Sequence, residues 1–255
     1  MRKRYSSIRV ASVIVAVMGL FVLAVLGRVL LTNSARQLAT AIENDDVSAV
    51  RRWASRISNL SRLRLPGGLC PLSFAIKEGK PDSFLTLLEG GIDPNTRNRD
   101  GTAPIHHASA ADSSVFIEYL LSHGADPDLQ VDGRHPCEHP LSWAIYTGRV
   151  DNAILLIKHG ADVDSVDSYG RNMLLQAWGA AEFEIVYQLL QHGADVNAPG
   201  KQDFTFIQHV RYASPSFYRN LPGRKEYWCE AVLDWLSARG IDVKTATWKG
   251  DRWIF

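Results

Sequence analysis

The chain has 255 residues, a formal net charge of +1 and 46% hydrophobic residues, enough for one medium-sized folded domain and an accessory segment. This balance excludes an intrinsically disordered chain, which would combine low hydrophobicity with high net charge. Five basic residues lie within the first 28 positions, so the rest of the chain carries a formal charge of −4. A nucleic-acid-binding protein normally has a clustered excess of Lys and Arg, and we therefore predict no nucleic-acid partner.

The N-terminus combines a basic segment, residues 1–9, with a run at 10–27 that contains no charged side chain. As a helix this run rises about 27 Å, and with three further apolar residues it can span the ~30 Å core of a bilayer. We therefore predict a transmembrane signal-anchor helix over residues 10–31. The excess of basic residues before the run predicts a cytoplasmic N-terminus. A cleaved signal peptide is the alternative, with a weak small-residue site at Asn33-Ser34-Ala35.

Residues 34–67 continue with apolar side chains at helical spacing, first at Leu38, Ala41 and Ile42 and again from Val47 to Ala54. This spacing predicts two helices joined near Asn44-Asp45, which together form an N-terminal capping pair. The pair is rich in arginine. These side chains form either a solvated outer face or a contact with anionic lipid headgroups: Arg51, Arg52, Arg56, Arg62 and Arg64.

A glycine-bearing pattern then repeats along the chain, and residues 100–128 show its most regular form. A turn at Gly101 leads to a helix start at Ala103-Pro104-Ile105-His106, and a second apolar helix stops at Gly124. Proline suits the first turn of a helix, where its missing N–H would be unpaired, and glycine suits a left-handed helix end. Triplets of the form Gly-x-Asp recur at glycines 91, 124, 160, 193 and 240, with separations of 33, 36, 33 and 47 residues.

This pattern resembles the ankyrin repeat, which has a period of 33 and carries Thr-Pro-Leu-His-x-Ala at the start of its first helix. Residues 103–108 read APIHHA, and related segments stand at 69–75, 139–144 and 172–177. The resemblance implies an all-α ankyrin-repeat solenoid of about five to six helix pairs with hairpin-like turns, preceded by one transmembrane helix. The regular repeats cover residues 68–200, and a divergent C-terminal repeat with a capping tail covers 201–255.

Two segments lengthen the period. The loop Gly133–Pro140 produces the spacing of 36, and an insertion at Tyr212–Trp228 produces the spacing of 47. We expect the insertion to form an ordered flap with aromatic side chains, or only to cover the end of the apolar stack. The aromatic tail Thr247–Phe255 is expected to pack on the last helix pair as a cap.

The loop before the third repeat contains His135, Cys137, Glu138 and His139, which are ligand types for zinc or copper. Because nearby residues of one loop seldom converge unaided, we predict neither a metal site nor a cofactor and keep a metal-binding module as a minor alternative. Cys70, Cys137 and Cys229 are an odd set, and whether any two form a disulfide stays open.

The sequence offers no catalytic motif. It contains no Gly-x-Ser-x-Gly, no His-Glu-x-x-His and no phosphate-binding glycine loop, and we predict that the protein is not an enzyme. In the ankyrin family the motif histidine typically bonds turn backbone, which implies a structural role for His106.

The resemblance also implies where a partner protein binds, because family members make contacts with their turn tips and with the exposed face of the first helices. Tyr and Arg contribute most to binding at such interfaces. The matching positions here are Lys77, Glu78, Arg97, Arg99, Thr102, His135, Tyr146, Thr147, Tyr169 and Arg171.

A short anchor followed by about five repeats is similar in layout to the ankyrin immunity proteins that neutralise periplasm-delivered lipase effectors of type VI secretion. This implies a single-pass protein of the bacterial inner membrane whose C-terminal domain faces the periplasm and binds and inhibits a secreted toxin. The alternative is a periplasmic scaffold or accessory protein that supports a stress-defence enzyme, similar to the ankyrin proteins associated with bacterial antioxidant enzymes.

Overall fold

A computed structural model describes residues 33–131, 137–200, 205–212, 223–241, 247–249 and 252–254. They fall into two compact units, one ending at Ile92 and the other beginning at Asp93. Among the described residues no helix has the length and apolar character needed to cross a bilayer. The predicted transmembrane helix over residues 10–31 lies outside the described residues, as does the basic segment before it.

The first unit contains two helix pairs. Residues 33–43 are helical, and the other helices of this unit are α2 (Val47–Ala54), α3 (Pro71–Lys77) and α4 (Pro81–Glu89), with short 3-10 turns η1 (Leu60–Arg62) and η2 (Pro66–Gly68). Asp46 caps α2, because its carboxylate accepts from the amide of Ala49 at 2.9 Å. The neighbouring Asp45 joins the two pairs, since its Oδ1 accepts from the amide and the hydroxyl of Ser83.

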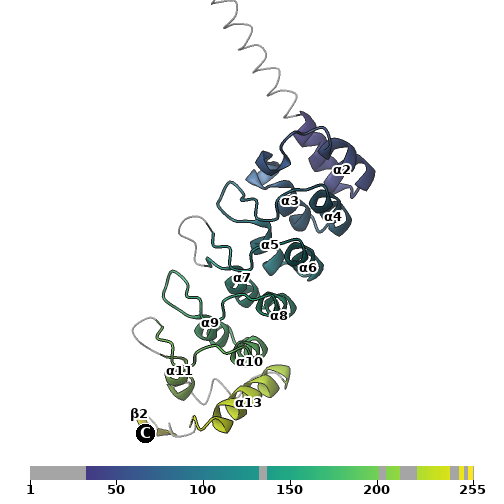
Figure 1. The fold of residues 1–255 in the computed structure, drawn as a ribbon. Coiled ribbons are helices and arrows are strands. Elements are labelled where there is room, and N and C mark those ends of the chain that lie inside the picture. Colours follow the sequence, from purple (N-terminus) through teal and green to yellow (C-terminus); the bar gives the residue numbers. More distant parts are fainter. Residues whose placement is uncertain are drawn as a thin grey trace, which may run out of the picture. The chain divides into compact units, whose positions relative to one another are not determined.

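The second unit continues the same helix-pair pattern. Figure 1 shows its first helices in one row and its second helices in an adjacent row, and neighbours within each row are in contact. The first helices are α5 (Pro104–Ala110), α7 (Pro140–Thr147), α9 (Met173–Gly179) and α11 (Phe206–Tyr212). The second helices are α6 (Val115–Ser122), α8 (Val150–Lys158), α10 (Phe183–Gln191) and α13 (Gly223–Ala238). The predicted helical solenoid with hairpin-like turns is therefore confirmed.

The tail departs from the all-α prediction. Strands β1 (Thr247–Lys249) and β2 (Arg252–Ile254) pair antiparallel, with Trp248 opposite Trp253. An antiparallel strand pair thus stands where the sequence predicted only a capping tail.

The core of the second unit runs between the two rows of helices. The first helices are short and bury their apolar side chains in this core; in α9, six consecutive residues from Met173 to Trp178 are buried. The ring of Trp178 meets Phe183 and Phe206 edge to face, with ring centroids 5.0 and 5.5 Å apart. Burying each such side chain contributes about 1.5–3 kcal/mol, so one aromatic cluster joins three consecutive helices.

The Gly-x-Asp triplets connect each repeat to the next. At the end of α6, Gly124 has a φ of 83°, and the amide of Ala125 donates to the carbonyl of Leu120 at 2.9 Å, which closes the helix. Further along the chain, Asp128 accepts from the amide of Asp162 at 2.8 Å, and Asp164 accepts from the amide of Asp195 at 2.8 Å. The triplet aspartate therefore donates its backbone amide to a carboxylate that stands two residues beyond the triplet of the preceding repeat, and these bonds link successive turns.

His106 also joins successive repeats, in the structural role that the family resemblance implies. Its Nδ1 accepts from the amide of Ala103 at 3.0 Å, which leaves Nε2 to donate to the carbonyl of Glu138 at 3.4 Å. The side chain is fully buried. Burial lowers the pKa of His106 to about 4, because the charged imidazolium is poorly solvated there. The imidazole is therefore neutral near pH 7 and occupied by backbone on both sides.

The three cysteines are free thiols. Cys70 and Cys229 are buried and Cys137 is half-buried. Burial raises the pKa of each thiol, and that of Cys229 to about 11. Within the described ranges, no three potential metal-ligating side chains cluster, and His135 of the candidate metal loop lies outside them.

Candidate functional site

Two turn tips of the second unit are described completely, and both are closed by backbone hydrogen bonds. In the tip at 98–102 the amide of Asn98 donates to the carbonyl of Thr102 at 2.7 Å, and in the tip at 167–171 the amide of Asp167 donates to the carbonyl of Arg171 at 3.0 Å. Each tip contains a glycine with positive φ at its bend. The tips are therefore tight hairpins that present their side chains in fixed positions.

Asp167 organises the second tip from beneath. Its side chain is completely buried. Oδ1 accepts from the amides of Tyr169 and Arg171 at 2.9 and 2.8 Å, and Oδ2 accepts from Nε and Nη2 of Arg171, both at 2.8 Å. The guanidinium of Arg171 also lies 5.4 Å from the centre of the Tyr169 ring, within the range of a cation–π interaction.

This arrangement pre-organises a tyrosine and an arginine for contact with a partner. Tyr169 and the Arg171 side chain are each 49% exposed, although hydrogen bonds restrict their backbone. A group that is already ordered before binding loses less conformational entropy on binding. Of the predicted contact residues, these two form the best-defined pair.

The first tip is built differently, and two of its predicted contact residues are structural. Thr102 is buried, and its hydroxyl donates to Asp100 at 2.6 Å. Arg97 donates through Nη1 to the carbonyls of Gly101 and Gln130, at 2.9 and 2.6 Å. Thr102 therefore has no exposed surface to offer, and Arg97 joins two neighbouring turns.

The remaining cation of the first tip is at the surface. Arg99 is exposed and stands at the bend of the hairpin, immediately before Asp100. Its long side chain can reach a partner without disturbing the bonds of Thr102 and Arg97. We therefore keep Arg99, and leave Thr102 out of the candidate surface.

The first helix of the third repeat adds an aromatic element. Tyr146 in α7 is 80% exposed, the largest exposure among the described bulky apolar side chains. Thr147 is also exposed, but its hydroxyl donates a hydrogen bond to the carbonyl of Trp143 at 2.7 Å. An exposed tyrosine offers a large contact area, and tyrosine is among the residue types that contribute most to interface energies.

Trp143 lies on the same helix and was not among the predicted contact residues. It is half-buried. Its Nε1 donates to the carbonyl of Cys137 at 2.8 Å, and its ring centre lies about 6 Å from those of His106 and His107. Its spacing of three residues from Tyr146, which places two side chains on one helix face, was the signal available in the sequence.

The other predicted contact residues lie elsewhere. Lys77 and Glu78 end the α3 region of the first unit, where Lys77 is exposed and Glu78 half-buried. His135 lies outside the described residues. The structure therefore brings together Arg99, Tyr146, Tyr169 and Arg171 only as members of the same unit, on consecutive repeats.

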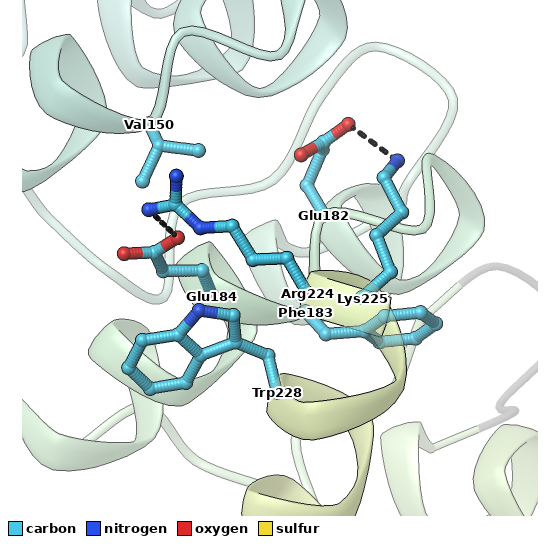
Figure 2. Close-up of a pocket in the computed structure, with 7 residues that line it drawn as sticks. All are labelled: Val150, Glu182, Phe183, Glu184, Arg224, Lys225 and Trp228. Atoms are coloured by element: carbon cyan, nitrogen blue, oxygen red, sulfur yellow. Dashed lines mark hydrogen bonds and ion pairs between the residues drawn. The ribbon is translucent and has the colours of Figure 1, made fainter. Parts of the chain in front are cut away.

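A pocket of about 340 Å³ opens at the N-terminal ends of three second helices. Val150, Phe183 and Trp228 form its apolar wall, and two ion pairs border it (Figure 2). Arg224 pairs with Glu184 at 2.7 Å, and Lys225 pairs with Glu182 at 3.0 Å. Because each cation already has a carboxylate partner, the pocket presents no unpaired charge of its own, and we assign it no ligand.

The length of α13 explains why this pocket exists. The helix has 16 residues, whereas α8 and α10 have nine each. Its additional N-terminal turns carry Arg224, Lys225 and Trp228 beside α10. There the ring centres of Trp228 and Tyr187 lie 5.3 Å apart. The predicted aromatic flap at 212–228 is therefore helical in its last six residues, and its residues 213–222 lie outside the described chain.

Known proteins share this repeat architecture. The family pattern described as ankyrin repeats (3 copies) matches residues 38–131 and 132–199. The mouse B-cell lymphoma 3 protein homolog is 32% identical over 130 residues, which is 50% of this chain and 29% of that protein. Bovine cyclin-dependent kinase 4 inhibitor B is 34% identical over 105 residues, which is 41% of this chain and 78% of that protein.

A bacterial protein and a crystal structure extend the comparison. Protein PhlB of Serratia liquefaciens is 29% identical over 135 residues, covering 52% of this chain and 57% of that protein. The crystal structure of the ankyrin repeat domain of Bcl-3 superposes with a TM-score of 0.61 and 26% identity, covering 69% of this chain and 79% of that domain. This chain thus matches less than a third of the mouse Bcl-3 homolog but most of the solved repeat domain.

Proposed function

Because this chain belongs to the ankyrin-repeat family, we propose that it is a membrane-anchored, periplasm-facing protein that binds and inhibits a secreted antibacterial toxin of the lipase effector class. Its ankyrin repeats form a module for binding another protein, and one relative is named as an inhibitor of a kinase.

One observation carries the proposal: the Tyr169–Arg171 tip is ordered before any partner arrives. A buried carboxylate with four hydrogen bonds fixes the tip from below. The exposed tyrosine and arginine then belong to the residue types that dominate interface energies. A tight inhibitor needs such preformed contacts, because ordering a loop on binding would reduce its affinity.

Inhibition by this surface requires no chemistry from the chain itself. A rigid hairpin carrying Tyr169 and Arg171, with Tyr146 on the preceding repeat, can occupy the rim of an enzyme's active site and exclude its substrate. The bovine relative, whose name is that of a kinase inhibitor, supports inhibition as a use of this repeat architecture. For this chain, the lipase class of target rests on the similarity in layout described above.

The membrane location is supported by the sequence. Eighteen residues without a charge, 10–27, follow a basic start, which favours a helix that crosses the bilayer with its N-terminus in the cytoplasm. In that topology the repeats meet a toxin delivered to the periplasm at the surface of the membrane it attacks.

The test is an inhibition assay with the full chain. Purified lipase effectors of type VI secretion are mixed with detergent-solubilised chain, and hydrolysis of a phospholipid substrate is followed. We expect stoichiometric inhibition that weakens in a Tyr146→Ala, Tyr169→Ala double variant. A Tyr227→Ala variant is the matched control, because Tyr227 is 63% exposed on α13, outside the proposed surface.

Two results would contradict the proposal. Binding of the lipase without any loss of its activity would remove inhibition. Selective capture of a stress-defence enzyme from membranes would favour the scaffold function.

A further inference from the structure

The charge of the chain is divided sharply along its length. Residues 1–65 contain eleven Lys and Arg against three Asp and Glu, a formal +8, whereas residues 66–255 contain seventeen against twenty-four, a formal −7. The near-zero total therefore conceals a basic N-terminal quarter. The part of this quarter that the structure describes is the capping pair at the start of the first unit.

Four arginines of this pair form the surface that we call the basic cap: Arg51, Arg52, Arg56 and Arg62. All four are exposed, and in the described part of the chain none of their side chains forms an ion pair. The nearest acidic residues in sequence are Asp45, which bonds Ser83, and Asp46, which caps the opposite end of α2. The positive charges of the basic cap are therefore not neutralised within the unit.

Local structure accounts for only part of this cluster. Basic residues near a helix C-terminus are favoured by the helix dipole, which explains Arg51 and Arg52 at the end of α2. Arg56 lies beyond the end of α2 and Arg62 belongs to η1, so this explanation does not extend to them. The guanidinium of Arg56 lies over the half-buried Trp53, 4.8 Å from the ring centre. Tryptophan is enriched at membrane interfaces, as are basic residues that reach headgroups.

The short connection between the helix at 33–43 and α2 determines which end of this helix pair carries the basic cap. Residues 33–43 and α2 are joined by only three residues, 44–46, and such short connections link antiparallel neighbours. The C-terminal end of α2, with Arg51 and Arg52, therefore lies near the beginning of the first helix. That beginning is separated from the uncharged run at 10–27 by only five residues, 28–32, which span at most about 18 Å when extended.

From these observations we infer that the basic cap contacts the anionic lipid headgroups of the membrane that the uncharged run crosses. This inference rests on the anchoring part of the proposed function. The anchor keeps the cap within a short distance of the bilayer, and the arginines then add an attraction of about 1 kcal/mol each near an anionic surface. This corresponds to roughly a fivefold change in the contact equilibrium per arginine. The contact would hold the first repeats close to the membrane.

The experiment follows the distance between the cap and the lipid in the full chain. Ser58, exposed between Arg56 and Arg62, is replaced by Cys in a Cys137→Ser background and labelled with a fluorophore, since the other two thiols are buried. The protein is reconstituted into phosphatidylcholine vesicles with or without phosphatidylglycerol, each containing lipid with a spin-labelled headgroup. We expect quenching to increase with phosphatidylglycerol and to disappear in 0.5 M salt, which screens the attraction.

The variant pair isolates the arginines. Arg52→Gln with Arg56→Gln should lower the ratio of contacting to non-contacting molecules about 30-fold. Lys158→Gln with Arg239→Gln removes the same charge from the second unit, including an arginine that also lies over a tryptophan, and should leave quenching unchanged. Equal quenching with both lipid compositions, or no effect of the Arg52 and Arg56 changes, would overturn the inference.

Anchoring is scored separately by flotation with phosphatidylcholine vesicles alone. If the chain does not float with them, the anchoring part of the proposed function fails, and flotation with phosphatidylglycerol vesicles then decides the lipid contact. If the wild-type chain floats with phosphatidylglycerol vesicles and the Arg52, Arg56 variant does not, the lipid contact is supported. If the wild-type chain does not float with these vesicles, the inference is overturned. If that variant instead loses affinity for duplex DNA while its lipid contact is unchanged, the cap is a nucleic-acid surface and the inference is wrong.

Discussion

Acid should weaken this fold through His106, and the effect can be calculated from the structure. The pKa of the buried imidazole is about 4 in the folded protein, compared with about 6.5 in an unfolded chain. Between these values the unfolded state binds more protons than the folded state, so the free energy of unfolding falls as the pH is lowered. The loss in the free energy of unfolding is absent above about pH 7, reaches about 2 kcal/mol at pH 5 and approaches about 3 kcal/mol below pH 4.

The assay is urea unfolding of the full chain in mild detergent, followed by far-ultraviolet circular dichroism at pH 7.5, 6, 5 and 4.5. The control is His106→Gln, which keeps an amide group near the carbonyl of Glu138 but does not titrate. The difference between the two proteins removes the contribution of all other groups. If wild type and variant lose the same free energy of unfolding between pH 7.5 and 4.5, the imidazole does not titrate as described, and the role of His106 as a buried neutral link is wrong.

Three further substitutions test the packing and the turn. Asn152→Ala should lower the free energy of unfolding by about 1–3 kcal/mol, because Nδ2 donates to three carbonyls that end α5. Urea midpoints decide this, with Glu230→Ala, exposed in the middle of α13, as a control that stays within about 0.5 kcal/mol. Trp178→Ala should cost about 3–5 kcal/mol by emptying the aromatic cluster, and a loss below 1 kcal/mol would contradict the packing. Asp167→Ala should speed amide hydrogen exchange at residues 169 and 171, and unchanged exchange would contradict the role of the carboxylate.

The fold followed from the sequence because its signals are local and repeated. A stop glycine with positive φ and an aspartate two residues later recur along the repeats. The glycine closes the helix, and the backbone amide of the aspartate donates to a side-chain oxygen of the preceding turn. Proline at the helix start recurs as well. Such features depend on a few neighbouring residues, so their spacing alone predicts the helix pairs.

The details of the surface followed less well, because they depend on contacts between distant residues. Thr102 occupies a turn position that suits a partner contact, but its burial depends on how the hairpin packs. The structural role of Arg97 requires the carbonyl of Gln130, 33 residues away. The pocket beside α13 requires ion pairs between residues about 40 positions apart. No local pattern in the sequence reports these pairings.

The most direct test of the account is the affinity of the full chain for its captured partner. The partner is isolated from membranes with the wild-type chain. The Kd of this partner for the wild-type chain, for the tyrosine double variant and for the control variant is then measured by titration calorimetry. The account predicts that Tyr146→Ala with Tyr169→Ala weakens binding at least tenfold, which is the effect of losing about 1.4 kcal/mol, while Tyr227→Ala binds like wild type. Equal affinity of all three proteins would contradict the assignment of the binding surface to the turn tips and first helices.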